Sequence, residues 1–265
     1  MALYFMLARV GYRRYAAYPA AAAAGLFTNV FFGFLIAYIL LAVYEERDDI
    51  GGYSEADTIT YVWLTQGLLS VVASFGPSWY ELALRVRSGN VATDLQRPLD
   101  LQRLLLAQDF GRAAHQLLYR AVPPVLIGAL VFDVVAPSEL LQWLAFALSV
   151  FLAIVVSFAI RFLVNLMSFW LLDYRGPTML AMVVSHLLSG LIIPLAFFPE
   201  PFGDAARVLP FASMLQLPID IFVGAASGAE VVGVLALQAF WAFTLLGMGR
   251  AALAAGTRKL VVQGG

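Results

Sequence analysis

The sequence lacks several residue types on which common protein chemistries depend. Its 265 residues include no cysteine, which excludes a disulfide framework, a thiol nucleophile and a thiolate metal site. The only lysine, Lys259, follows no glycine-rich loop, so the chain carries no phosphate-binding loop of the ATP-hydrolysing type. The two histidines, His115 and His186, belong to no H-E-x-x-H motif. We therefore expect no cofactor, metal or catalytic residue in this chain.

Charged residues are also scarce. They make up 12% of the chain and hydrophobic residues 62%, against about 25% and about 45–50% in soluble domains. A water-soluble core cannot absorb that excess, so the composition predicts an integral membrane protein. Six crossings of about 20 residues would leave only short loops, which predicts one transmembrane domain over residues 1–265. The net charge of -1 argues against a nucleic-acid partner.

Long uncharged stretches predict the number of crossings. Five of them are long enough for a helix to cross about 30 Å of hydrocarbon. A weaker sixth stretch contains Arg120 and Asp133 near its ends, where a side chain can reach the interface. The sequence thus predicts an all-α membrane protein with six spans, over residues 19–44, 58–80, 115–136, 140–163, 177–198 and 231–250.

The basic residues predict the orientation of these spans. With both termini in the cytoplasm, every Arg and Lys except Arg47 and Arg207 lies on or toward the cytoplasmic side, as the positive-inside rule requires. Acidic residues crowd the first outer loop instead, in and after the run Glu45–Asp49. That run lacks the ligand spacing of a calcium loop, so we interpret it as a solvated loop.

Two segments are expected to lie at the membrane surface. Residues 1–18 mix arginines with large apolar residues, which predicts a cytoplasmic interfacial helix. The apolar run that follows exceeds the hydrophobic region of a secretory signal, so we expect this segment to be retained. Residues 200–229 are apolar but interrupted by prolines and charges, which predicts short interfacial or re-entrant helices on the outer side.

Arg161, near the end of the fourth span, has two interpretations. If the helix continues to Asp173, Arg161 lies about 18 Å inside it and needs a polar partner or a water-filled path. If the helix ends near Arg161, the side chain reaches the cytoplasmic interface. The sequence leaves both open.

Two motifs resemble those of ABC-2 type exporter permeases. The expected cytoplasmic coupling loop covers residues 81–114. In its part from Arg85 to Pro98, a glycine and a short mixed stretch precede the sequence Leu-x-Arg-Pro. The second motif is similar to the fifth helix and outer re-entrant segment of that family and comprises Ser189–Pro199, Leu209–Phe211, Leu217–Pro218 and Gly224. The resemblance covers essentially the whole chain and is to the branch in which the ATPase is a separate protein.

The resemblance implies roles for particular residues. The cytoplasmic loop would form a coupling helix that docks on an ATPase, with Leu95 as an apolar anchor and Asp94 and Arg97 at the rim. The coupling segment would comprise Gly89, Asn90, Val91, Asp94, Leu95, Gln96, Arg97 and Pro98. Pathway or structural polar positions would be Arg161, Asn165, Gly190 and Pro194. Taken by itself, the loop also reads as an ordinary basic loop that only fixes topology.

The function that the resemblance implies is that of the permease subunit of an ATP-binding-cassette exporter in a prokaryotic inner or plasma membrane. Its partners would be ABC ATPase subunits, which bind ATP and Mg²⁺, a second identical or paralogous permease chain, and membrane lipid. The path would run mainly along the first, second and fifth spans. No motif identifies the substrate.

Two other functions remain open. An ion-coupled secondary transporter needs an intramembrane ionisable residue, for which Arg161 is the only candidate, and we expect no carboxylate at mid-depth. A membrane-embedded enzyme needs a catalytic constellation, and the sequence contains none that we recognise.

Overall fold

The computed structural model describes residues 2–46, 50–171 and 173–259. Within these ranges the chain is all-helical, apart from loops and an isolated bridge between Ile50 and Tyr53, which confirms the all-α part of the predicted fold class. Part of the acidic outer loop, namely residues 47–49, lies outside the described residues, as do Leu172 and the C-terminal residues 260–265.

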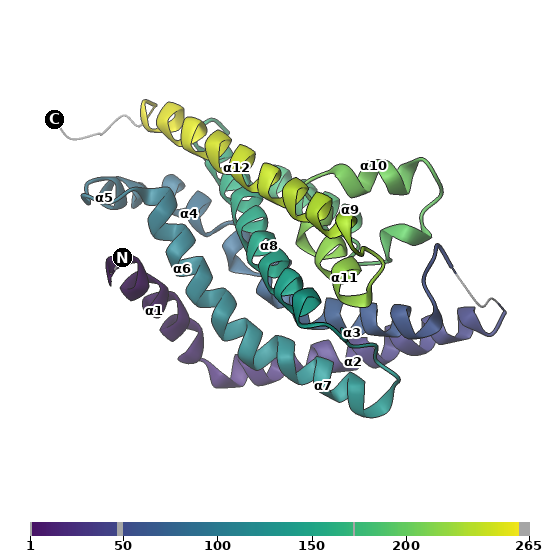
Figure 1. Ribbon diagram of the computed structural model, residues 1–265. Coiled ribbons are helices and arrows are strands. Elements are labelled where there is room, and N and C mark those ends of the chain that lie inside the picture. The colour runs from purple at the N-terminus through teal and green to yellow at the C-terminus, as the bar shows by residue number, and fades with distance from the viewer. Residues whose placement is uncertain (1, 47–49, 172, 260–265) are drawn as a thin grey trace.

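The helices follow one another along the chain as shown in Figure 1. They are α1 (Ala2–Ala16), α2 (Pro19–Tyr44), α3 (Glu55–Val71), α4 (Glu81–Arg87), α5 (Val91–Leu95), α6 (Leu101–Gln116), α7 (Val122–Val131), α8 (Leu140–Leu166), α9 (Arg175–Leu188), α10 (Phe202–Val208), α11 (Gln216–Val223) and α12 (Ala229–Thr257). A π-helical turn, Leu117–Ala121, joins α6 to α7, so that these two form one continuous helix.

Four of these helical segments are long and apolar enough to cross a membrane: Pro19–Tyr44, Leu101–Val131, Leu140–Phe169 and Ala229–Thr257. The first coincides with the expected first span, because Pro19 opens the helix and no charge interrupts it. The second begins at Leu101, well before the expected start near residue 115. Asp100 caps its first turn by accepting a hydrogen bond from the backbone N–H of Arg103 at 2.9 Å.

The other two expected spans contain shorter helices. α3 and α9 have 17 and 14 residues, or about 26 Å and 21 Å of helix. α3 begins with a capping box at Ser54 and stops at Val71, before a turn in which Ala73 and Gly76 have positive φ. α9 likewise ends just before Gly190, at φ 80. Six crossings therefore remain a prediction.

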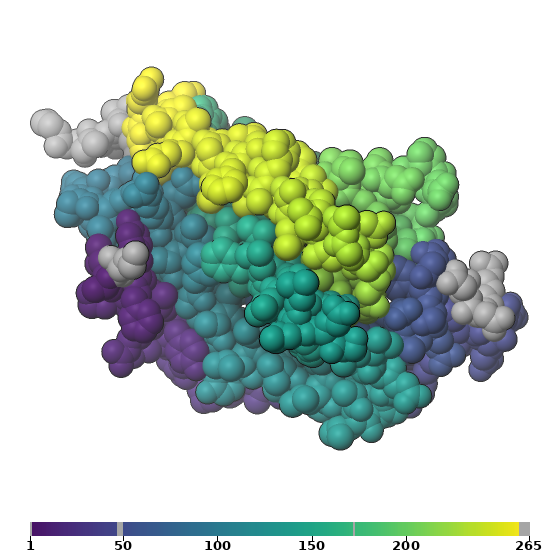
Figure 2. All heavy atoms as spheres, in the orientation of Figure 1, coloured from purple at the N-terminus to yellow at the C-terminus, as the bar shows by residue number. Residues whose placement is uncertain are grey.

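The core is built around α3 and α8. Every residue of α3 from Thr58 to Val71 is buried, and the helix packs on α2, α7 and α11. α8 packs along α12 and also contacts α11. In the space-filling view α12 lies across α8 (Figure 2). Large apolar side chains remain exposed on the outer helices, such as Phe27, Leu130 and Phe243 at 73%, 85% and 78%. Surface of this kind requires lipid or another protein.

The amphipathic helix α1 is held against α6 by a close crossing of two glycines. A Cβ on Gly11 would lie 2.0 Å from the carbonyl oxygen of Gln108, and one on Gly111 would lie 1.8 Å from that of Ala8. Only glycine at both positions permits this approach. α1 therefore lies directly alongside α6 (Figure 1).

Candidate functional site

The segment that resembles a coupling helix forms two short helices joined by a turn. α4 ends at Arg87, Gly89 turns the chain with φ 76, and α5 occupies Val91–Leu95. Val91 is fully buried and belongs to an apolar cluster with Leu82, Val86, Leu101, Phe158, Phe162 and Leu166. The segment is thus packed onto the ends of α6 and α8 rather than extended into solvent.

The predicted coupling residues divide into an inner and an outer set. Asp94 is 8% exposed, and its carboxylate pairs with Arg85 at 3.1 Å, so it faces into the chain. Leu95 is half-buried against the apolar cluster that contains Val91. The outer set is exposed and comprises Gly89, Asn90, Gln96, Arg97 and Pro98.

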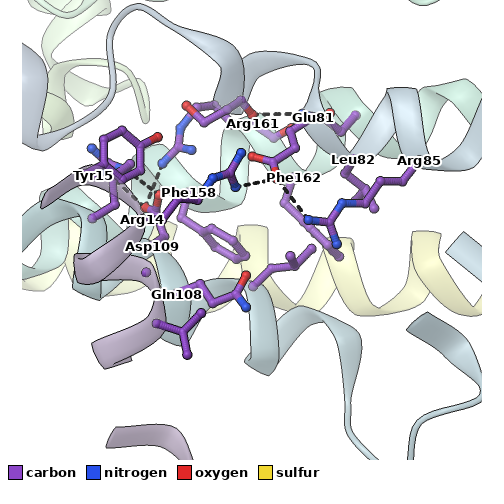
Figure 3. Close-up of a pocket in the computed structure, with 16 residues that line it drawn as sticks. Arg14, Tyr15, Glu81, Leu82, Arg85, Gln108, Asp109, Phe158, Arg161 and Phe162 are labelled. Carbon is purple, nitrogen blue, oxygen red and sulfur yellow. Dashed lines mark hydrogen bonds and ion pairs between the residues drawn. The ribbon is translucent and has the colours of Figure 1, made fainter. Parts of the chain in front are cut away.

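A chain of ion pairs joins α5 to α1. Arg85 donates to Asp94 at 3.1 Å and to Glu81 at 2.9 Å, and Glu81 also accepts from Arg14 on α1 at 2.7 Å. Arg14, Glu81 and Arg85 are seen together in Figure 3. Hydrogen bonding to Glu81 raises the pKa of Arg14, so this arginine stays charged. Three helices that are separate in the sequence are thereby connected at one polar cluster.

Asn165 connects the same segment to α8. Its Oδ1 accepts from the backbone N–H of Ala83 at 2.9 Å, and its Nδ2 donates to the carbonyl of Trp79 at 3.1 Å. The N–H of Ala83 belongs to the first turn of α4, where no intrahelical acceptor is available. Asn165 therefore acts as a cap supplied by another helix.

One turn along α8, Arg161 has a buried ionic partner. The helix continues beyond it to Leu166 and through a 3-10 turn to Phe169, so Arg161 lies inside the helix. Its Nη2 donates to Asp109 of α6 at 2.8 Å, and its side chain is 4% exposed. The structure thus provides the polar partner that a deep Arg161 needs, which the sequence had left open.

Asp109 also binds Arg112, which completes a buried triad of one carboxylate and two guanidiniums. Arg112 Nε donates to Asp109 at 2.7 Å, while Nη1 and Nη2 donate to the carbonyls of Ser70 and Val71 at 2.7 Å each. Those carbonyls belong to the last turn of α3, which has no further helical donors. The triad therefore ties α6, α8 and the end of α3 together.

The triad and the ion pairs at Glu81 line one cavity of about 380 Å³. Arg14, Glu81, Arg85, Asp109 and Arg161 surround it in Figure 3, together with the rings of Phe158 and Phe162. Four arginines and two carboxylates share this wall. Residues of α1, α4, α6 and α8 therefore meet at this cavity.

A larger cavity, of about 840 Å³, lies between α2, α3, the turn after α3, the α6–α7 helix and the segment after α9. Its polar residues include Asn29, Gln66, Gln116, Arg120 and His186. Arg112 reaches its wall, whereas Arg161 lines only the smaller cavity. A partly apolar cavity of this volume is large enough to hold a small molecule.

Gly190 and Pro194 lie in a separate polar cluster between α3 and the start of α11. Tyr61 donates to the carbonyl of Gly190 at 2.7 Å and to Gln216 Oε1 at 2.9 Å. A Cβ on Gly190 would lie 2.2 Å from the Tyr61 hydroxyl. Pro194 is buried, and the next residue, Leu195, donates its N–H to Gln216 at 2.8 Å.

Gln216 extends this cluster to Tyr53 and Asp220. It donates to Tyr53 at 2.9 Å and to Asp220 at 2.6 Å, and Tyr53 donates to Asp220. Burial, and next the negative charge of Asp220, raise the pKa of Tyr53, so its hydroxyl remains a donor. Asp220 also pairs with Arg207 at 3.4 Å. The segment around α10 and α11 is therefore joined to α3 by side-chain hydrogen bonds.

The sequence had indicated neither Asp109 nor Gln216 as a site residue. Asp109 and Arg112 were placed in the cytoplasmic loop because charges near them hid the apolar helix that begins at Leu101. The available signal was their spacing of three residues, which puts both on one helix face. Gln216 gave no signal, since its partners come from distant segments.

Four helices of the described residues are long and apolar enough to cross a membrane, which indicates a multi-pass membrane protein. A family model for ABC-2 family transporter proteins matches residues 29–264, nearly the full length, so the chain belongs to the ABC-2 transporter family. Permeases of this family are the membrane component of a transporter, are generally non-catalytic and generally pair with ABC ATPases. A search of curated proteins found no match. The resemblance seen in the sequence is thus confirmed.

Proposed function

We propose that this chain is the permease subunit of an ATP-driven exporter in the cell membrane of a prokaryote. It crosses the bilayer six times with both termini in the cytoplasm, α1 lies at the cytoplasmic interface, and residues 200–229 form outer re-entrant helices. A second permease chain, identical or paralogous, completes the path. Separate ATPase subunits bind ATP and Mg²⁺, and this chain contributes no catalytic group.

The observation that carries the proposal is the continuous polar connection between the coupling segment and the membrane helices. α5 is joined through Arg85 and Glu81 to α1, and α4 is joined through Asn165 to α8. A partner that displaces α4 and α5 must therefore move α1 and α8 as well. An ordinary loop that only fixes topology needs no such connection.

The large cavity supports a path along the expected first, second and fifth spans. Its walls come from α2, α3 and the end of the α9 region, with a contribution from the α6–α7 helix. Ion coupling is less well supported. A secondary transporter needs an intramembrane ionisable residue that can bind and release the coupling ion. Asp109 is a buried carboxylate, but two guanidiniums hold it, so it is not left free to exchange protons.

Reversing the charge of Arg97 tests the docking. Arg97 is exposed and belongs to the outer set of the coupling segment. In membranes that contain the cognate ATPase, we expect Arg97→Glu to lower ATPase retention about tenfold, the equivalent of about 1.4 kcal/mol. Arg175→Glu, at an exposed arginine at the start of α9, is the matched control. Equal retention in both variants, or copurification of no ATPase, would refute the proposal.

A further inference from the structure

Arg120 lies well inside the apolar part of the helix that carries it. It belongs to the π-helical turn of the continuous helix Leu101–Val131, about 16 Å from the outer end at Val131. Its guanidinium meets α2 at Asn29, about 15 Å from the start of that helix. A charge at such a depth is costly, and in membrane proteins it generally marks a functional position.

No carboxylate neutralises Arg120 among the residues that the structure describes. Its Nη2 donates to Asn29 Oδ1 at 3.0 Å, its Nε has no hydrogen-bond partner, and no ion pair includes it. The guanidinium lies directly on α2 at Gly25, where a Cβ would come within 2.3 Å of it. Arg112 and Arg161, by contrast, share Asp109. Arg120 is thus a positioned cation without a counter-ion.

Two further polar groups without partners lie beside Arg120 in the wall of the 840 Å³ cavity. Gln116 is 7% exposed and Ser70 9% exposed, yet Gln116 Oε1 and Ser70 Oγ make no hydrogen bond. Buried polar atoms normally have partners, so this part of the wall carries unused hydrogen-bonding capacity. The rest of the wall is largely apolar and includes Phe32, Leu35, Ile36, Leu69, Phe75 and Ile192.

We propose that this cavity binds an amphipathic anion, with Arg120 as the counter-ion of its carboxylate, phosphate or sulfonate group. A change of rotamer would turn Ser70 Oγ and Gln116 Oε1 toward the cavity, where Ser70 would donate to the anionic group and Gln116 would accept from a neighbouring hydroxyl or amide. The apolar wall would hold the hydrophobic body. This inference rests on the proposed function, since it takes the cavity as the transport path and names the class of substrate.

A matched pair of fluorescent probes tests this site. The full-length chain with its ATPase is placed in discs of phosphatidylcholine without ATP, and binding of dansylaminoundecanoic acid is compared with binding of its uncharged methyl ester. We expect the wild-type chain to bind the acid at least about tenfold more tightly. Arg120→Gln should abolish that preference while still binding the ester, and Arg120→Lys should retain most of it. Arg103→Gln, at an exposed arginine of the same helix, should leave it unchanged.

Equal affinity of the wild-type chain for acid and ester would overturn the inference, as would an unchanged preference in Arg120→Gln. Repeating the titration with phosphatidylglycerol in the discs separates two sources of the anion. Competition by this lipid in the wild-type chain but not in Arg120→Gln identifies a lipid headgroup, and undiminished acid binding identifies a separate solute. Because binding is measured without ATP, its failure is distinguishable from failure of ATPase docking.

Discussion

Replacing Asp109 with asparagine should destabilise the chain more than removing either arginine beside it. Asp109 is 7% exposed and is the only carboxylate within the triad, where it accepts from Arg112 at 2.7 Å and from Arg161 at 2.8 Å. Asparagine leaves two buried guanidiniums without a negative partner. Breaking a buried ion pair by removing one partner costs about 3–5 kcal/mol.

Arg161→Met should be much milder, although it removes an equally buried residue. The neutral pair Asp109–Arg112 would remain, and Arg112 would keep its bonds to the carbonyls of Ser70 and Val71. The variant then loses one charge-assisted hydrogen bond, and this loss is partly offset because a buried guanidinium no longer has to be desolvated. The free energy of unfolding should fall by at most about 2 kcal/mol. The double variant Asp109→Asn/Arg161→Met should be more stable than Asp109→Asn alone.

Thermal unfolding of the wild-type protein and of these three variants, each purified in the same neutral detergent, measures this order. Arg250→Met is the matched control, because Arg250 is 63% exposed and pairs with Asp100 at 3.5 Å; exposed pairs contribute about 0–1 kcal/mol. An Arg161→Met variant as unstable as Asp109→Asn would refute the reasoning. So would a double variant whose loss equals the sum of the two single losses.

Three further substitutions test other contacts. Gly111→Leu should drive α1 away from α6, because even a Cβ would lie 1.8 Å from the Ala8 carbonyl oxygen and overpacking costs about 1–3 kcal/mol. Faster proteolysis of α1 would report this displacement, and unchanged proteolysis would contradict the close crossing. Asn165→Leu should leave the Ala83 N–H unpaired, which costs about 1–3 kcal/mol of stability, and should lower the transport achieved per ATP hydrolysed. Unchanged coupling would exclude Asn165 as the connection between α4 and α8. Gly190→Val should lower the melting temperature more than Gly176→Val, because Gly190 has φ 80 and a Cβ there would lie 2.2 Å from the Tyr61 hydroxyl, while a Cβ on Gly176 meets nothing within 4 Å. Equal shifts would refute the assigned strain.

Uninterrupted apolar helices were readily predicted from the sequence. α2 occupies Pro19–Tyr44, the same range as the expected first span, because a proline opens it and acidic residues follow its end. The helix at Leu101 was harder to recognise. Its first turns carry Arg103, Asp109 and Arg112, and hydropathy treats these as loop residues although two of them neutralise each other inside the protein.

In the segment that the sequence resemblance implies is a coupling helix, two short helices, α4 and α5, flank Gly89, and the direction of their side chains was not predictable from the sequence. Asp94 of α5 faces inward because it pairs with Arg85 of α4. That pair depends on how α4 and α5 fold back on each other. The unpaired Arg120 was judged interfacial from its distance to the expected span end. The continuous helix through residue 101 moves that end and leaves Arg120 inside.

Because the chain has no cysteine, one introduced thiol reports on one position without background. Gln96→Cys places a thiol on the exposed face of the coupling segment, and Ser227→Cys places one in the exposed turn before α12. In intact cells, a membrane-impermeant maleimide should label Ser227→Cys and not Gln96→Cys. In inverted vesicles, Gln96→Cys should be labelled, and bound ATPase should protect it. Labelling of Gln96→Cys from outside the cell, or labelling that ATPase leaves unchanged, would contradict the account that this segment receives the ATPase.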